Sequence, residues 1–112
     1  MSLQFRQGDV LLEMVSGLPD GAVLQAPNGV TRNILAYGEV TGHAHAVDSK
    51  LSEMYQWTAD GKLEETFLVA RPGATLRHEE HSAITLAPKE ATAPSVYKVI
   101  RQVEYTPEAP RQ

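Results

Sequence analysis

The four histidines are the residues whose type and spacing could do chemistry in this chain. They form two close pairs, one separated by an alanine and the other by two glutamates: His43, His45, His78, Glu79, Glu80 and His81. A neutral imidazole offers one nitrogen lone pair to a transition metal, and carboxylates can complete its ligand set. The sequence therefore predicts that these residues bind a divalent metal ion (Zn, Fe, Ni or Mn) or a small polar ligand.

The first pair lies in the segment G-E-V-T-G-H-A-H-A-V. On a strand, residues two apart point to the same side, so His43, His45 and Val47 share one face. Ala44 and Ala46 share the other face. At about 3.3 Å per residue, the Cα atoms of the two histidines are roughly 6.6 Å apart. Two imidazoles at this spacing can converge on one ion.

The second pair lies in R-H-E-E-H-S, and the sequence leaves its geometry open. If the segment is extended, His78 and Glu80 share one face, and Glu79 and His81 share the other. That gives three histidines with a carboxylate, or two histidines with carboxylates. If the segment turns helically, His78 and His81 meet at a spacing of three residues, and four histidines come together.

The competing interpretation is structural, with H-E-E-H as a solvated turn and the histidines capping backbone groups or stacking on aromatic rings. Ser82 beside His81 makes a poor nucleophile pair, because adjacent strand residues face opposite ways. Tyr97 and Tyr105 are expected to pack in the core. Whether the protein is an enzyme is left open; if it is, the ion would serve as a Lewis acid or redox centre.

Short apolar runs separated by turn signals every 8–15 residues predict an all-β fold, a small barrel or sandwich. The predicted strands span 9–15, 22–25, 30–40, 43–47, 53–58, 62–69, 74–77, 83–86 and 96–105. No window has a 3.6-residue period, so little helix is expected. A single domain should cover 1–105, with an irregular tail over 106–112.

Glycine, proline and asparagine place the expected turns. Asn28-Gly29 favours a tight hairpin, and Gly38 and Gly42 predict a bend before the first histidine pair. The polar hairpin over 53–69, with Asp60-Gly61 at its turn, is expected to form an edge or a lid.

Composition excludes several classes of function. Fourteen acids against ten scattered bases give a net charge of −4, which argues against a nucleic-acid or membrane-surface partner. Without cysteine there is no thiolate zinc site or cysteine nucleophile. The first residues carry no apolar signal segment, and a soluble cytoplasmic protein is expected. The expected partner is a metal ion or small molecule, and a homo-oligomer is compatible with the sequence.

His43-Ala44-His45 after Gly38, and Pro72-Gly73 before His78, resemble the two motifs of the cupins, which are small β-barrels. Pro72-Gly73 lacks the residue that separates proline and glycine in the second motif, and it lies farther from His78 than in that motif. This resemblance implies a histidine-ligated metal inside a barrel. Ser49 and Lys50 stand where the first cupin motif has its glutamate.

Four further segments resemble a group of small uncharacterised bacterial and phage-associated proteins. They are F-R-Q-G-D-V-L-L, G-E-V-T-G-H-A-H, L-R-H-E-E-H-S-A-I-T-L and Y-K-V-I-R-Q-V-E-Y-T-P, and they span most of the chain. The resemblance singles out Gly42, both histidine pairs and Glu79 without implying a ligand. It also suggests an alternative function, a non-catalytic phage- or prophage-associated interaction module.

Overall fold

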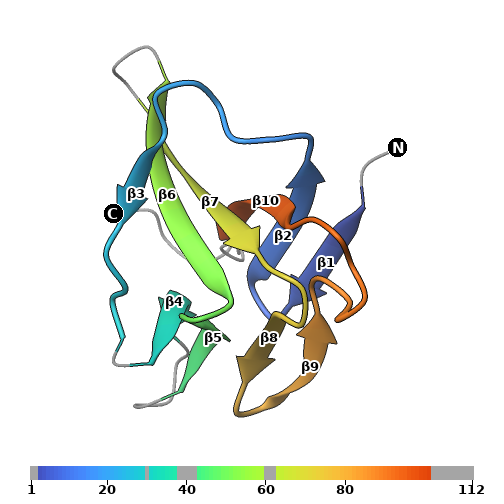
Figure 1. The fold of residues 1–112 in the computed structure, drawn as a ribbon. Coiled ribbons are helices and arrows are strands. Elements are labelled where there is room, and N and C mark those ends of the chain that lie inside the picture. Colours follow the sequence, from blue (N-terminus) through green and yellow to red (C-terminus); the bar gives the residue numbers. More distant parts are fainter. Residues whose placement is uncertain (1–2, 30, 38–42, 60–62, 102–112) are drawn as a thin grey trace, which may run out of the picture.

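The computed structural model describes residues 3–29, 31–37, 43–59 and 63–101 of the chain (Figure 1). Ten strands occur in these ranges. They are β1 Gln4–Gln7, β2 Val10–Val15, β3 Val23–Gln25, β4 Arg32–Tyr37, β5 Ala44–Asp48, β6 Ser52–Ala59, β7 Leu63–Ala70, β8 Thr75–His78, β9 His81–Thr85 and β10 Ser95–Arg101. No helix occurs in the same ranges, so the predicted all-β class is confirmed.

The strands form two antiparallel sheets, a six-stranded one in the order β1-β2-β10-β7-β6-β3 and a four-stranded one in the order β4-β5-β8-β9. The pairings of the described strands give two open sheets and do not close a barrel. Every predicted strand has a counterpart, whereas β1 was not predicted. The glycines of the expected bend, the Asp60-Gly61 turn and the predicted tail lie outside the described residues.

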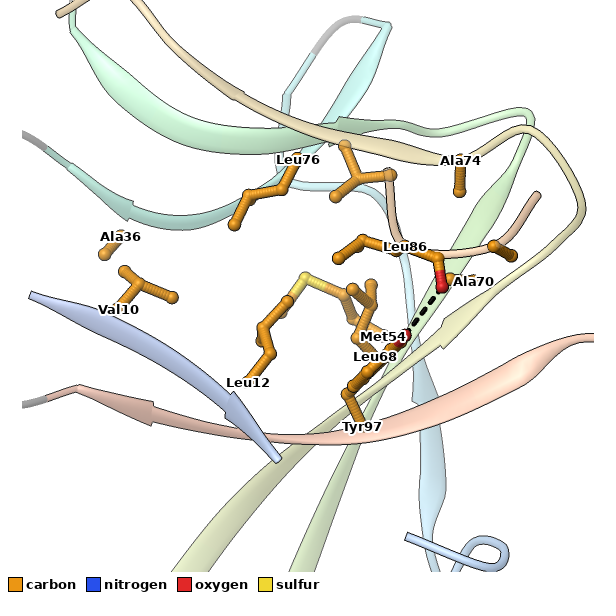
Figure 2. Packing of buried hydrophobic residues seen from close by; sticks show 12 residues of the cluster. Val10, Leu12, Ala36, Met54, Leu68, Ala70, Ala74, Leu76, Leu86 and Tyr97 are labelled. Carbon is orange, nitrogen blue, oxygen red and sulfur yellow. Dashed lines mark hydrogen bonds between the residues drawn. The ribbon is translucent and has the colours of Figure 1, made fainter. Parts of the chain in front are cut away.

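One apolar core lies between the two sheets. The six-stranded sheet contributes Leu12, Leu68 and Tyr97, and the four-stranded sheet contributes Val47 and Leu76. Figure 2 shows Leu76, Leu86 and Tyr97 converging in this core. Tyr97 is completely buried, as predicted from the sequence, and its hydroxyl donates a 2.6 Å hydrogen bond to the Leu86 carbonyl. Burial raises the pKa of this phenol.

Replacing Tyr97 by phenylalanine should lower the free energy of unfolding by about 1–2 kcal/mol, because the Leu86 carbonyl loses its buried donor. Urea denaturation measures the change. Tyr55→Phe is the matched control, since Tyr55 is only partly buried and its bond to Glu53 is 3.3 Å long. An equal loss in both variants would contradict the assigned role of the Tyr97 hydroxyl.

The predicted Asn28-Gly29 hairpin is wrong. The strands on either side of it, β3 and β4, belong to different sheets and pair with β6 and β5 instead. The Asn28 side chain explains the difference, because it accepts a hydrogen bond from Ile34 N at 2.7 Å and donates one to Ile34 O at 3.0 Å. The Asn28 side-chain amide thus fixes how the chain enters β4. It does not form a turn between two paired strands.

The hairpin predicted over 53–69 exists, but its expected place at an edge or in a lid is wrong. β6 and β7 lie inside the six-stranded sheet, between β3 and β10. The apolar run Phe67–Ala70 of β7 is buried throughout. This run, and not the polar first half of the hairpin, decides where the hairpin packs.

Three tight turns connect the strands that approach the histidines. In the turn Arg71–Ala74, Pro72 is followed by Gly73 at φ 94°, and Ala74 N donates to Arg71 O; these are the signs of a type II turn. β1 and β2 are joined by Gly8 and Asp9 alone. β8 and β9 are joined in the same way by two glutamates.

Candidate metal centre

The H-E-E-H segment is a two-residue β-hairpin, which is neither of the geometries predicted from the sequence. His78 ends β8 and His81 begins β9, and the two are cross-strand partners. Glu79 and Glu80 form the turn between them. Cross-strand partners stand side by side on one face, so the hairpin brings these two histidines together and leaves the glutamates at its tip.

His45 is the second residue of β5, and only 2% of its surface is exposed. The predicted division of faces is confirmed for this strand. Val47 packs in the main core, whereas Ala44 and Ala46 form a separate small cluster with Ile34. His45 therefore faces between the sheets, where the β8–β9 hairpin meets it.

Three histidines come together at this point. His45, His78 and His81 each offer a ring nitrogen, and the three atoms lie within 4.8 Å of one another. The ring of His45 is 4.2 Å from that of His78 and 5.6 Å from that of His81, measured between centroids. Exposure rises from the buried His45 through the half-buried His78 to the exposed His81. The cluster is thus anchored inside the protein and opens to solvent at one end.

Gln7 determines which nitrogen of His45 is free. The Gln7 amide nitrogen donates to the carbonyls of Ser82 at 2.8 Å and Leu76 at 3.2 Å, so its orientation is fixed. Its oxygen then accepts from His45 Nδ1 at 2.9 Å. Because Nδ1 carries the proton, Nε2 keeps its lone pair. A partner of this kind is what orients a metal-binding histidine in known sites.

Asp9 faces this free nitrogen. Its Oδ1 lies 3.4 Å from His45 Nε2, while its Oδ2 accepts from Arg101 Nε at 3.1 Å. Partial burial raises the pKa of the Asp9 carboxyl, but the hydrogen bond and positive charge of Arg101 outweigh this effect, so the pKa is lowered overall. Asp9 is therefore a carboxylate with one oxygen anchored and the other directed at the cluster.

Gly8 provides the space in front of the rings. Its φ is 59°, which the tight β1–β2 hairpin requires and which glycine adopts without strain. A β-carbon at Gly8 would lie 2.9 Å from His81 Nε2 and 3.1 Å from His45 Cε1. The backbone of the β1–β2 turn thus lies against both rings, and only a residue without a side chain fits there.

His78 is held by its own turn. Its Nδ1 accepts a 3.0 Å hydrogen bond from the backbone N–H of Glu80, so the neutral ring carries its proton on Nε2. Metal coordination by His78 therefore requires the Glu80 N–H to release Nδ1. This rearrangement is confined to the two-residue hairpin turn.

The remaining predicted site residues lie beside the cluster. His43 Nδ1 is 3.1 Å from Glu80 Oε2 without hydrogen-bond geometry, and this buried nitrogen has no hydrogen-bond partner among the described residues. Glu79 accepts from Ala44 N at 3.0 Å and lies 3.8 Å from Arg32. The His43–Glu80 and Glu79–Arg32 contacts border the three-histidine cluster. The clustered nitrogens come from His45, His78 and His81.

Sequence reasoning missed Gln7, Gly8 and Asp9 as site residues. They belong to the Q-G-D stretch that precedes β2, about 36 or more residues before the first clustered histidine. A glycine between two polar residues at the start of an apolar strand was the available signal. It indicates a tight turn with polar side chains, but not what the turn contacts.

In metal-free protein, the His45 pKa should make stability depend on pH. Burial, and then the charge of His78, lowers this pKa below its ordinary value of 6.5. The unfolded chain therefore takes up the proton first, so the contribution of His45 is fully present above pH 6.5 and is lost as the pH falls below it. Urea denaturation between pH 5 and 8 should show this decline. The decline should be smaller in His45→Gln, which keeps an N–H for Gln7; an unchanged profile would contradict the assignment.

These features define an all-β domain of two packed antiparallel sheets with a histidine cluster between two hairpin turns. The chain belongs to the family described as a domain of unknown function (DUF8820), which matches residues 6–102. No curated protein and no solved structure matches it. Within the described ranges, no helix has the length and apolarity needed to cross a membrane.

Proposed function

We propose that this domain binds a divalent transition metal through His45, His78, His81 and Asp9. The observation that carries the proposal is the approach of three imidazole nitrogens within 4.8 Å, one of them with its lone pair left free by Gln7. The exposed end of the cluster gives an ion a path to the buried nitrogen.

The distances suit a metal of the first transition series. Ligand atoms at about 2.0–2.1 Å from a tetrahedral zinc ion are roughly 3.3 Å apart. The separation of Asp9 Oδ1 and His45 Nε2, 3.4 Å, already has this value. The three histidine nitrogens span more, up to 4.8 Å, and must close around the ion. His81 is exposed and His78 lies at a hairpin turn, so these two can move while His45 stays fixed.

The donor set also bears on what the ion would do. Three histidines and one carboxylate saturate a four-coordinate zinc ion, which is the arrangement of a structural site. Iron, manganese or nickel in octahedral geometry would keep two positions for water or substrate. The same four residues therefore support a structural zinc ion or a catalytic ion of higher coordination number.

Titration of protein purified without a histidine tag tests the proposal. Isothermal titration with zinc, nickel, manganese and ferrous iron should give one site per chain for at least one of these ions. A chelator should remove the ion and lower the thermal midpoint, because an ion that binds only the folded state stabilises it. Absence of saturable binding for all four ions would overturn the proposal.

The Gln7 amide should raise the metal affinity without touching the ion. Gln7→Ala removes the acceptor that holds the His45 ring, and loss of such a partner typically costs about 10- to 100-fold in affinity. Zinc titration of the folded variant, checked by circular dichroism, measures the loss. Gln4→Ala, on the same strand but exposed, should bind as the unaltered protein does. Equal affinities for the two variants would refute the orienting role.

The alternative is a non-catalytic interaction module whose histidines are structural. The bond from Glu80 N to His78 Nδ1 favours it, because it stabilises the hairpin turn without any ion. On this alternative, His78→Ala destabilises the protein and no metal binds. The metal titration therefore separates the two functions.

A further inference from the structure

A concave feature lies over the four-stranded sheet. It is a cleft of about 280 Å³ over β4, β5 and β8. Its lining residues come from these strands and the adjoining loops: Thr31, Arg32, Ala46, Val47, Asp48, Leu51, Gly73, Thr75 and Arg77. At about 30 Å³ per water molecule, the volume corresponds to roughly nine waters, which suits a small ligand.

Strand alternation separates this cleft from the histidine cluster. Ala46 follows His45 on β5, and Arg77 precedes His78 on β8, so each cleft residue points away from its metal-site neighbour. Ala46 and Arg77 are cross-strand partners. The Ala46 and Arg77 side chains therefore lie on the face of β5 and β8 opposite to the histidine rings, whereas Val47, another lining residue, packs in the core.

Two arginines flank the floor of the cleft. Arg32 on β4 pairs with Asp48 of β5, and Arg77 on β8 pairs with Ala46 of β5, so the two arginines come from the strands on either side of β5, and both line the cleft. The floor between them is low because the Ala46 side chain is only a methyl group, and Gly73 leaves the adjoining wall without a side chain. Small residues between long cationic ones create the hollow.

The charges of the cleft favour an anion. Arg77 is exposed and forms no ion pair within the part of the chain that the structure describes. Arg32 lies 3.8 Å from Glu79 Oε2, a long contact between half-exposed side chains. The acid of the lining, Asp48, already accepts the backbone N–H of Lys50 at 2.8 Å. Thr75 adds a hydroxyl. The lining of the cleft thus holds two cations and one carboxylate, with Glu79 beside Arg32 outside the lining, in a protein whose net charge is −4.

We propose that this cleft binds a small organic anion through a carboxylate or phosphate group held between Arg77 and Arg32. The planar guanidinium fork matches both groups bidentately. The site does not depend on the metal, because no cleft residue is among the proposed ligands.

Titration with inorganic phosphate, followed by ¹H–¹⁵N correlation spectra, tests the proposal, and a parallel titration with acetate distinguishes the two ligand groups. The titration uses metal-free protein at pH 8. Any chelator is dialysed away first, because it is itself a polyanion. Ionic strength is held constant with sodium chloride. Saturable shifts are expected at residues 31–32, 46–48 and 73–77.

Arg77→Met and Arg32→Met should each weaken the binding about tenfold or more, because each removes charge-assisted hydrogen bonds. Lys98→Met is the matched control, since it removes one positive charge from the six-stranded sheet and should change the affinity less than twofold. Lack of saturation with both anions, or equal weakening by Lys98→Met, would overturn the proposal.

Discussion

His45→Ala should abolish stoichiometric zinc binding, with a loss in affinity of at least a hundredfold. His45 is the buried, oriented member of the cluster, and its Nε2 lies 3.4 Å from Asp9 Oδ1. Loss of a partner that merely orients a ligand already costs about 10- to 100-fold, and loss of the ligand itself should cost more. Competition titration against a chromophoric chelator measures the affinity.

The control for this variant is two residues away. His43→Ala makes the same exchange in the same H-x-H motif but removes a ring that lies beside Glu80, outside the three clustered nitrogens. Its zinc affinity should stay within about threefold of the unaltered protein. If His43→Ala lost the metal and His45→Ala kept it, the ligand set proposed for this site would be wrong.

A second large loss of zinc affinity is expected on substitution of Gly8, a residue with no side chain. Gly8→Ala introduces a β-carbon 2.9 Å from His81 Nε2 and 3.1 Å from His45 Cε1. His45 is buried and cannot yield, whereas the exposed His81 can swing outwards. The variant should therefore fold but lose at least tenfold in zinc affinity. The left-handed backbone conformation adds a loss of about 1–2 kcal/mol in stability.

Gly21→Ala separates the clash from the backbone strain. Gly21 also has a positive φ, 90°, but an added β-carbon there meets nothing closer than 3.9 Å, on Trp57. It should therefore show the stability loss alone, with unchanged zinc affinity. Parallel urea denaturation and zinc titration of both variants provide the measurement. Equal zinc affinities in the two variants would show that Gly8 does not bound the site.

Local signals were sufficient to predict much of the fold. Alternating or continuous apolar runs predicted strands that all have counterparts in the structure. Where local and tertiary preferences competed, the local signal failed. Asn28 bonds the backbone of Ile34 instead of closing a hairpin, and the apolar end of β7 draws a polar hairpin into the interior of a sheet.

The candidate site could be predicted only in part, because its completion is non-local. The clustering of the histidines in the sequence pointed to the right region, and H-E-E-H indeed brings two of them together. Gln7, however, bonds Ser82 from 75 residues away and His45 from 38. No pattern within β1 indicates that this amide meets those residues. The sheet pairing supplies that information.

In the proposed site, three imidazoles and one carboxylate surround a single metal ion. X-ray absorption at the zinc edge of tag-free, zinc-loaded protein tests this ligand set. We expect one zinc per chain with three histidine nitrogens and one oxygen at about 2.0–2.1 Å, and a loss of imidazole scattering in His45→Ala. A zinc content far below one per chain, or a first shell without imidazole, would contradict it.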